Sequence, residues 1–569
     1  MKKKTAHLTY WQIIWRQFRH HYLGLFALYA IFLFALAGIY APFLASSKPL
    51  IVQYDGVWYF PLFRYLFFTG FFTKGLDIFY NLLIFTFPLL FAAWFILKSY
   101  PTRRFFAICF LLIAHLFLFI YLFYRAPQDP AANPALNQAK QRDIQSQLQA
   151  EKNNPLFIFP SLTWEQELSY MTPYAKLNLA LRYQQRKAQQ ERLAPYAEAY
   201  AGNAKRKGKK ELSMPTLWQL DRNQERQRIA SYKHIIDQHE DAYKQAKQTL
   251  ALYREKCQKD LVPASSKPIE CDVLQKLPQE DKTRLLQARQ LVKDVESAQT
   301  HLAYIRDRQE WLEQQQSKLK YEIMPLLRPF HWEDDAGGEQ DLNRYISWWE
   351  LTRINRKDMV AALIFGIRVS LSVGLLAIGL ALLIGVPIGA MAGYYGGKID
   401  ILTYRLIEIW ESMPTFFMLL MIVAFLQSKS IFLVIAIIGL FGWTGFSRFV
   451  RGEFFRQKQL PYVEACKAQG FNDRFIMFSH LLPNAIPPLL TLVPFAIMGA
   501  ITSEAGLSFL GLGEEGSSSW GVLMDEGRSA FPSESYLLWP PAILLTLLLV
   551  SIALVGDTLR DALDPKLRH

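Results

Sequence analysis

The chain has 569 residues, of which 51% are hydrophobic and 20% are charged, and its formal net charge is +14. This composition excludes a single soluble globular domain, because apolar runs long enough to cross about 30 Å of hydrocarbon stand beside a long polar stretch. It also argues against nucleic-acid binding, since the Lys and Arg residues cluster at the ends of the apolar runs and no recognition motif accompanies them.

Eight apolar runs are long enough to cross a membrane, and we predict a transmembrane helix for each. The first run is too long for a signal peptide and lacks a small-residue cleavage site. Lys and Arg near the ends of the runs place both termini in the cytoplasm by the positive-inside rule. The runs cover residues 22–44, 79–97, 105–124, 363–391, 406–427, 431–448, 486–503 and 540–557.

A polar segment, 125–358, separates the third run from the fourth. Because three crossings precede it, we expect it on the side of the membrane away from the cytoplasm. Good helix formers dominate residues 216–260 and 276–323, and a Pro-containing turn at 263–268 lies between them. We predict an antiparallel helical hairpin that reaches about 65 Å from its base. A compact helical bundle is the alternative.

Four cysteines are present in the chain. Cys257 and Cys271 flank the predicted turn of the hairpin, on the side of the membrane where a disulfide persists. Two alternatives remain open for them, a disulfide or two unpaired thiols. Cys109 and His115 lie in the third apolar run, where we expect packed or hydrogen-bonded core side chains.

Glu408 and Glu411 lie three residues apart on one predicted helix face, just before Pro414. A carboxylate within a membrane segment is a candidate functional group, so both residues are candidates for a substrate path. The alternative is structural, because Arg405 lies three residues before Glu408 and offers a helical ion pair.

A polar, helix-prone segment lies between the sixth and seventh runs. Its successive Ala residues allow a short helix to lie close against a partner surface, and Gly470 can end that helix with a positive φ. Pro483 suits the first turn of the next helix. An ordinary loop between two spans is the alternative. The candidate site residues are Glu464, Ala465, Cys466, Lys467, Ala468, Gly470, Phe471, His480, Leu482 and Pro483.

This segment resembles the EAA loop of ABC importer permeases, whose pattern is E-A-A-x3-G-x9-I-x-L-P. The chain departs from it at Cys466, where Ala is usual, and at His480, where Ile is usual. The whole C-terminal part resembles the permeases of dipeptide, oligopeptide and nickel importers, of the oligopeptide permease C type. Further matches to that family lie at Asn355–Asp358, Gly366–Leu371, Ala392–Asp400, Glu504–Gly513, Ser519–Gly521 and Gly556–Pro565.

The resemblance implies an all-α polytopic membrane protein. It has a type I ABC importer permease core, about eight transmembrane helices and a large, mainly helical extra-cytoplasmic insertion. The expected parts are an N-terminal cytoplasmic helix with the first transmembrane helix (1–45), a loop with an extra transmembrane pair (46–124), the insertion (125–358), and the permease core with five transmembrane helices and the EAA-like loop (359–569).

The resemblance also implies the membrane subunit of an ATP-driven importer, in which ATPase motion drives alternating access. Oligopeptides or dipeptides are the expected substrates, and nickel chelates and peptide-like antibiotics are the alternatives. The chain contains no G-x-x-x-x-G-K-[ST] phosphate loop, so ATP and Mg are expected on partner subunits and no cofactor on this chain. The implied partners are two ATP-binding subunits, a second homologous permease, an extra-cytoplasmic solute-binding protein and membrane lipid. The implied location of the chain is the bacterial inner membrane.

The long insertion leaves a second function open. A signalling scaffold would pass ATPase motion through the membrane into the hairpin and act on a cell-wall or partner protein without moving a solute. The transport-type C-terminal part argues against this alternative, and ATP-dependent uptake of labelled peptide into vesicles discriminates between the two.

Overall fold

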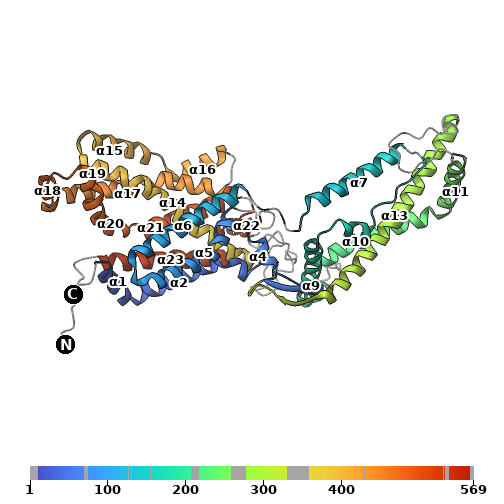
Figure 1. Ribbon diagram of the computed structural model, residues 1–569, viewed down its shortest axis with the longest axis horizontal. Coiled ribbons are helices and arrows are strands. Elements are labelled where there is room, and N and C mark those ends of the chain that lie inside the picture. The colour runs from blue at the N-terminus through green and yellow to red at the C-terminus, as the bar shows by residue number, and fades with distance from the viewer. Residues whose placement is uncertain are drawn as a thin grey trace.

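The computed structural model consists of a bundle of apolar helices and an elongated arm that projects from one end of the bundle (Figure 1). The arm is formed by α7 to α13 and strand β3. The structure describes residues 10–68, 75–125, 127, 129, 131–153, 156–206, 217–257, 277–329, 358–426, 430–514, 516–529, 531 and 537–563.

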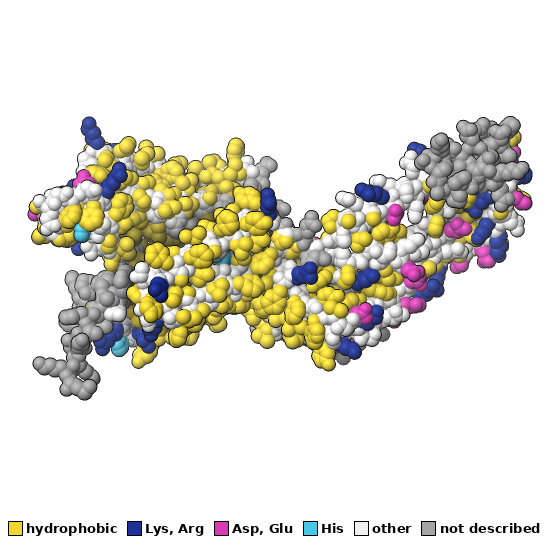
Figure 2. All heavy atoms as spheres, in the orientation of Figure 1, with side chains coloured by type: hydrophobic (Ala, Val, Ile, Leu, Met, Phe, Trp, Pro, Cys, Tyr) yellow, Lys and Arg dark blue, Asp and Glu magenta, His cyan; other side chains and the backbone are white. Residues whose placement is uncertain are grey.

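Seven helices among the described residues are long and apolar enough to cross a membrane. Each corresponds to one of the predicted runs, and the hydrophobic side chains on their outer faces cover the bundle (Figure 2). They are α2 (Tyr22–Ile39), α5 (Gly75–Ile96), α6 (Pro101–Tyr124), α14 (Met359–Tyr395), α17 (Ile431–Lys458), α21 (Val493–Leu507) with the π-helical turn η5 (Ser508–Leu512), and α23 (Trp539–Leu563).

Two predicted spans are broken in the structure. The run 406–427 is divided between α15 (Gly397–Glu411) and α16 (Thr415–Leu426), which are bent by 70°, so it makes an eighth crossing only if the bent pair is one span. Pro414 lies at the break and lacks the backbone N–H that would continue the helix. The run 486–503 begins in a separate short helix, α20 (Leu482–Leu490), and prolines on both sides of that break explain the error.

The remaining elements of the bundle side and of the arm are shorter or polar. They are α1 (Tyr10–His20), α3 (Ala41–Leu44), α4 (Pro61–Tyr65), η1 (Leu97–Ser99), α7 (Pro134–Asn153), α8 (Trp164–Ser169), α9 (Pro173–Arg206), α10 (Leu217–Gln238), α11 (Glu240–Lys256), α13 (Gln279–Lys318), α18 (Pro461–Ala468), α19 (Asp473–Phe475), η4 (Ile476–Leu481) and α22 (Trp520–Ser529).

Glycines bring α14 and α17 into close contact at the centre of the bundle. Gly385, Gly389 and Gly393 are spaced by four residues and therefore share one face of α14. A Cβ added at Gly389 would lie 2.3 Å from the backbone oxygen of Ser447 on α17. Small residues are what allow membrane helices to approach so closely, since van der Waals contact replaces the hydrophobic effect there.

The hairpin predicted in the arm is present. Tyr232 of α10 stacks on His301 of α13, with ring centroids 5.3 Å apart, and Cys257 after α11 shares a buried cluster with Leu285. As the residue number increases from Tyr232 to Cys257, the number of the contacting residue on α13 decreases from His301 to Leu285. The two helical segments therefore run antiparallel. The 40 residues of α13 correspond to about 60 Å, a length that favours the hairpin over the compact-bundle alternative.

The prediction for the end of the hairpin was wrong. Helix α13 ends at Lys318, and Leu319–Ile323 form strand β3 rather than a further helical turn. Cys257 is buried and disulfide-bonded. Its predicted partner, Cys271, lies outside the described residues, so that pairing stays a prediction.

A three-stranded antiparallel sheet, which the sequence did not predict, lies at the foot of the arm. Its order is β2-β1-β3, and β1 (Ile51–Tyr54) and β2 (Val57–Tyr59) come from the loop after α2. Val52 and Tyr54 of β1 are buried against Leu177 and Leu181 of α9. The sheet therefore joins the loop after the first span to the end of the insertion.

The foot of the arm is fixed to α14 by a buried ion pair. Arg328 Nε lies 3.3 Å from Asp358 Oδ2, and their side chains are 3% and 1% exposed. Asp358 is also the N-cap of α14, since its Oδ1 accepts a hydrogen bond from the backbone N–H of Ala361 at 2.8 Å. One carboxylate thus starts the helix and holds the arm.

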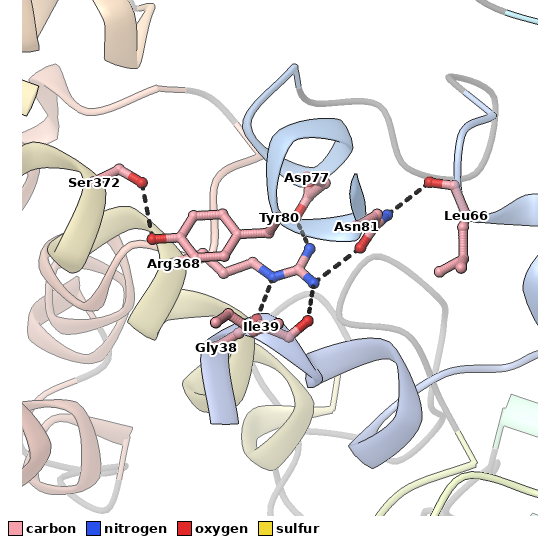
Figure 3. A network of polar contacts seen from close by, with 8 residues as sticks. All are labelled: Gly38, Ile39, Leu66, Asp77, Tyr80, Asn81, Arg368 and Ser372. Carbon is pink, nitrogen blue, oxygen red and sulfur yellow. Dashed lines mark hydrogen bonds and ion pairs between the residues drawn. The ribbon is translucent and has the colours of Figure 1, made fainter. Parts of the chain in front are cut away.

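The extra pair of helices, α5 and α6, is joined to the bundle through the guanidinium of Arg368 on α14 (Figure 3). Its Nη1 donates to Asp77 Oδ1 at 2.8 Å, and its Nη2 donates to Asn81 Oδ1 at 2.9 Å. The Nε and Nη2 groups also donate to the carbonyls of Gly38 and Ile39 at the end of α2, at 2.7 and 3.3 Å. Arg368 is 1% exposed, so these hydrogen bonds take the place of the water molecules that would otherwise hydrate the guanidinium.

Removing the carboxylate of Asp77 should destabilise the bundle, because Arg368 would then be a buried charge without its counter-ion. We expect Asp77→Ala to cost about 3–5 kcal/mol and to lower the thermal unfolding midpoint of the purified protein. The double variant Asp77→Leu with Arg368→Met should recover part of that loss, since it removes both charges together. Asp241→Ala, at a carboxylate 97% exposed on the arm, should unfold like the wild type. Wild-type unfolding of Asp77→Ala would contradict the prediction.

Candidate functional site

The EAA-like segment forms helix α18 at the end of the bundle opposite the arm (Figure 1). Pro461 occupies its first turn, where a missing N–H costs nothing. Val463 is fully buried and fixes the helix to the bundle. Within α18, four predicted site residues face solvent, and these are Glu464, Ala465, Lys467 and Ala468.

Gly470 ends this helix with a φ of +77°, as the sequence predicted. Its N–H donates to the carbonyl of Lys467 at 3.0 Å, and the N–H of Phe471 donates to the carbonyl of Cys466 at 3.2 Å. A side chain at residue 470 would be strained by this φ and would project into open space. The glycine is thus required by the backbone, and the surface around it stays free.

An exposed aromatic ridge follows the glycine. The rings of Phe471 and Phe475 stack with centroids 5.0 Å apart, and the ring of His480 lies edge-on to Phe475 at 5.3 Å. Phe471, Phe475 and Phe478 are 43%, 42% and 54% exposed. We call these three residues, with the solvent-facing residues of α18, the distal surface. It presents a polar helix beside an apolar ridge, which is a surface suited to a protein partner.

His480 supports this ridge from below, which explains why a flat ring is tolerated where Ile was expected. Its Nε2 is buried and has no hydrogen-bond partner among the described residues. Behind it, Ile476 and Leu481 of the π-helical turn η4 are fully buried. Leu482 and Pro483 then begin α20, as predicted.

Tyr394, at the last turn of α14, holds the distal surface to the bundle. Its hydroxyl donates to Asp473 Oδ1 at 2.6 Å. Its ring lies 5.7 Å from the Nζ of Lys467 and 5.7 Å from the Nζ of Lys458. No role was predicted for this tyrosine, although it lies within the Ala392–Asp400 motif. Its partner is 79 residues away, and no local pattern could have identified it.

A second contact holds α18 to the end of α17. The hydroxyl of Tyr462 donates to Gln457 Oε1 at 2.9 Å, and Gln457 Nε2 donates to Glu453 Oε1 at 2.7 Å. Burial raises the pKa of the Tyr462 phenol, so the group stays protonated and continues to donate.

The turn before α15 is also fixed. Gly396 and Gly397 have φ of +66° and +53°, positive values that glycine adopts without strain. Asp400 accepts from Arg451 Nη2 at 2.8 Å, which ties α15 to α17.

Both acidic candidates for a substrate path are paired with arginines at the surface. Glu408 pairs with Arg405 at 2.6 Å, which is the structural alternative foreseen from the sequence. Glu411 pairs with Arg448 of α17. The structure does not bring either carboxylate to the distal surface, and their role in a substrate path stays a prediction.

A third carboxylate, Glu504 of α21, is fully enclosed in the bundle. It is 1% exposed, and its Oε1 accepts from the hydroxyls of Ser508 and Ser519 at 2.7 Å each. It therefore holds the segment before α22 against α21. In the sequence this acid directly follows the apolar run 486–503 and begins the matched segment Glu504–Gly513, and an acid at a membrane segment marks a functional or structural site. Among the described residues, no group of three His, Cys, Asp or Glu side chains could hold a metal ion.

Comparison with known proteins finds two family models that match separate segments of the bundle. Residues 385–569 match the family described as binding-protein-dependent transport system inner membrane component. Residues 9–58 match the N-terminal TM domain of oligopeptide transport permease C.

Individual relatives support the same assignment. The oligopeptide transport system permease protein of Haemophilus influenzae is 35% identical over 247 residues, which cover 43% of this chain and 79% of that protein. The peptidoglycan transport system permease protein YejE of Agrobacterium fabrum is 39% identical, over 38% of this chain and 57% of its own length. The inner membrane ABC transporter permease protein YejE of Escherichia coli is 37% identical, over 38% of this chain and 63% of its own length. The chain thus spans less than two thirds of these last two relatives.

Among solved structures, an inward-facing methionine ABC transporter aligns with 36% of this chain and 97% of its own, at 18% identity and a TM-score of 0.30. A TM-score of 0.30 is too low to support a conclusion about the fold or function of this chain.

Removing the Tyr394 hydroxyl should loosen the distal surface without unfolding the bundle. A hydrogen bond to a charged group contributes about 1.5 kcal/mol, so Tyr394→Phe should speed amide exchange of residues 470–475 about tenfold. Tyr395→Phe is the matched control, since that ring is 45% exposed and its change should leave the exchange unaltered. Equal exchange in the two variants would contradict the role given to Tyr394.

Proposed function

The chain belongs to the family of inner-membrane components of binding-protein-dependent transport systems, and from this premise we propose that it is the permease subunit of an ATP-driven peptide importer. The observation that carries the proposal is the distal surface, an exposed helix and aromatic ridge tied to a membrane-spanning helix. It lies within residues 385–569, the part that matches the family.

The distal surface is the proposed contact for an ATP-binding subunit. A partner groove that closes around α18 would pull on Tyr394 through Asp473, and on α17 through Tyr462 and Gln457. Both helices belong to the tightly packed centre of the bundle, so a rigid-body movement there changes the bundle as a whole. ATP and Mg would be held by two such subunits and not by this chain.

The proposed orientation puts the distal surface in the cytoplasm and the arm outside, in the bacterial inner membrane with both termini cytoplasmic. Arg448, Arg451, Arg456 and Lys458 lie in the last turns of α17, next to the distal surface. Positive charge at this end of the spans supports a cytoplasmic location.

Peptides are the proposed substrates because relatives that share the bundle are named as oligopeptide and dipeptide permeases. A second homologous permease would complete the passage, and a solute-binding protein would deliver the peptide on the arm side.

The signalling scaffold remains a second candidate because of one contact. The buried pair of Arg328 and Asp358 joins the arm directly to α14, the same helix that carries Tyr394. Motion at the distal surface therefore has a physical route to the arm whether or not a solute moves.

Transport should fail when the distal surface is altered. Glu464→Lys reverses an exposed charge, and Gly470→Leu strains the helix end, so each should reduce ATP-dependent uptake of labelled peptide by reconstituted complex at least tenfold. Glu313→Lys, on an exposed position of α13, is the matched charge reversal and should transport normally. Wild-type uptake by a Glu464→Lys complex that retains its ATPase would refute the coupling role. ATP hydrolysis without uptake in the wild type would favour the scaffold.

Labelling of introduced cysteines should establish the orientation, because Cys257 is disulfide-bonded and does not react with a maleimide. In a background with Cys466→Ala and Cys109→Ala, Leu286→Cys on the arm should react with a membrane-impermeant maleimide in intact spheroplasts. Gln469→Cys beside the distal surface should react only after lysis. The reverse pattern would overturn the proposed topology.

A further inference from the structure

One face of the sheet at the foot of the arm has no packing partner among the residues that the structure describes. Val52 and Tyr54 of β1 point toward α9, so alternation directs the other side chains of the sheet away from the arm. On that outer side the rings of Trp58 and Tyr321 stack with centroids 5.7 Å apart. They are 50% and 71% exposed, which is unusual for a pair of large aromatic side chains.

More apolar side chains extend this face toward the bundle. Phe63 of α4 packs edge-on against Phe43 of α3, with centroids 5.6 Å apart, and the N–H of Leu326 donates to the carbonyl of Phe43. Leu326 is 81% exposed. We call the whole set the aromatic face, and it comprises Trp58, Phe60, Phe63, Tyr321, Ile323 and Leu326.

The backbone at Tyr321 indicates that its ring position matters. Its φ is +49°, in the left-handed region where a side chain is disfavoured and glycine is the usual residue. Its position coincides with an irregularity in the pairing of β1 with β3. The irregularity re-aims the side chain, as β-bulges do, and the ring comes to lie against Trp58.

The aromatic face lies at the level where the spans end. Helix α3 begins two residues after α2 ends at Ile39, and Phe43 of α3 touches the face directly. Figure 2 shows the hydrophobic surface of the bundle continuing onto the foot of the arm. Trp and Tyr favour the boundary between lipid headgroups and acyl chains, where the ring is apolar and its polar edge stays wet.

The charges around the face also suit a lipid headgroup layer. Lys320 is exposed and pairs with Gln53 on the outer side of the sheet, and a basic side chain near the membrane surface attracts anionic phospholipids. The nearby acid, Asp55, lies 3.8 Å from Lys318 Nζ, so its charge is partly balanced.

We propose that the aromatic face binds the phospholipid surface on the arm side of the membrane and so fixes the foot of the arm in the headgroup layer. The occupant is lipid because the face is continuous with the lipid-facing surface of the spans. The contact does not depend on transport, and it holds for either candidate function.

An environment-sensitive fluorophore would test the proposal on the full chain in nanodiscs of phosphatidylethanolamine and phosphatidylglycerol. The label is placed at Trp58→Cys or Tyr321→Cys, in the Cys109→Ala and Cys466→Ala background. Leu286→Cys is the control, since Leu286 is 55% exposed and lies at the far end of α13. We expect blue-shifted emission at residues 58 and 321, and at least twofold stronger quenching by doxyl lipid labelled near the headgroup than at residue 286.

Two outcomes would overturn the proposal. Emission and quenching equal to those at residue 286 would mean that the face lies in water. Shielding that appears only when a second permease is co-purified, with no quenching by doxyl lipid, would mean that the occupant is a protein. Use of two separate label positions keeps the test valid if one substitution prevents folding.

Discussion

One buried cation, the guanidinium of Arg368, determines how the membrane part is assembled. It bonds to side chains of α5, to the end carbonyls of α2 and, through its own backbone, belongs to α14. A buried guanidinium is tolerated only when its N–H groups are hydrogen-bonded to acceptors and its charge is balanced by a counter-ion. The extra pair of helices is therefore a component of the bundle, and the loop and arm that follow it begin from a fixed point.

Features encoded by local patterns could be predicted from the sequence. The apolar runs, the positive φ of Gly470 and the antiparallel helices of the arm each depend on residues close together in the chain. The sheet was missed because β3 pairs with a strand over 260 residues earlier, and its segments are too short to show a period. The broken spans were missed because hydropathy registers apolar length and gives little weight to Pro414 or to paired prolines.

Only the part of the candidate site that is contiguous in the sequence could be predicted. Residues of α18 and the turn after it are contiguous, so a motif could identify them. Tyr394 and Glu504 were not assigned a role, because their functions come from partners on other elements. In the sequence, Arg368 is one residue of the matched segment Gly366–Leu371. Asp77 and Asn81, one helical turn apart at the start of the apolar run 79–97, were the overlooked signal for its partners.

Helix α14 is held at both ends, by Asp358 to the arm and by Tyr394 to the distal surface. Its 37 residues make a rod about 55 Å long. A tilt of this rod by about 5° around its centre would displace its two ends by about 2.5 Å in opposite directions. The end of α14 that is joined to the arm would then move opposite to the end that carries the distal surface.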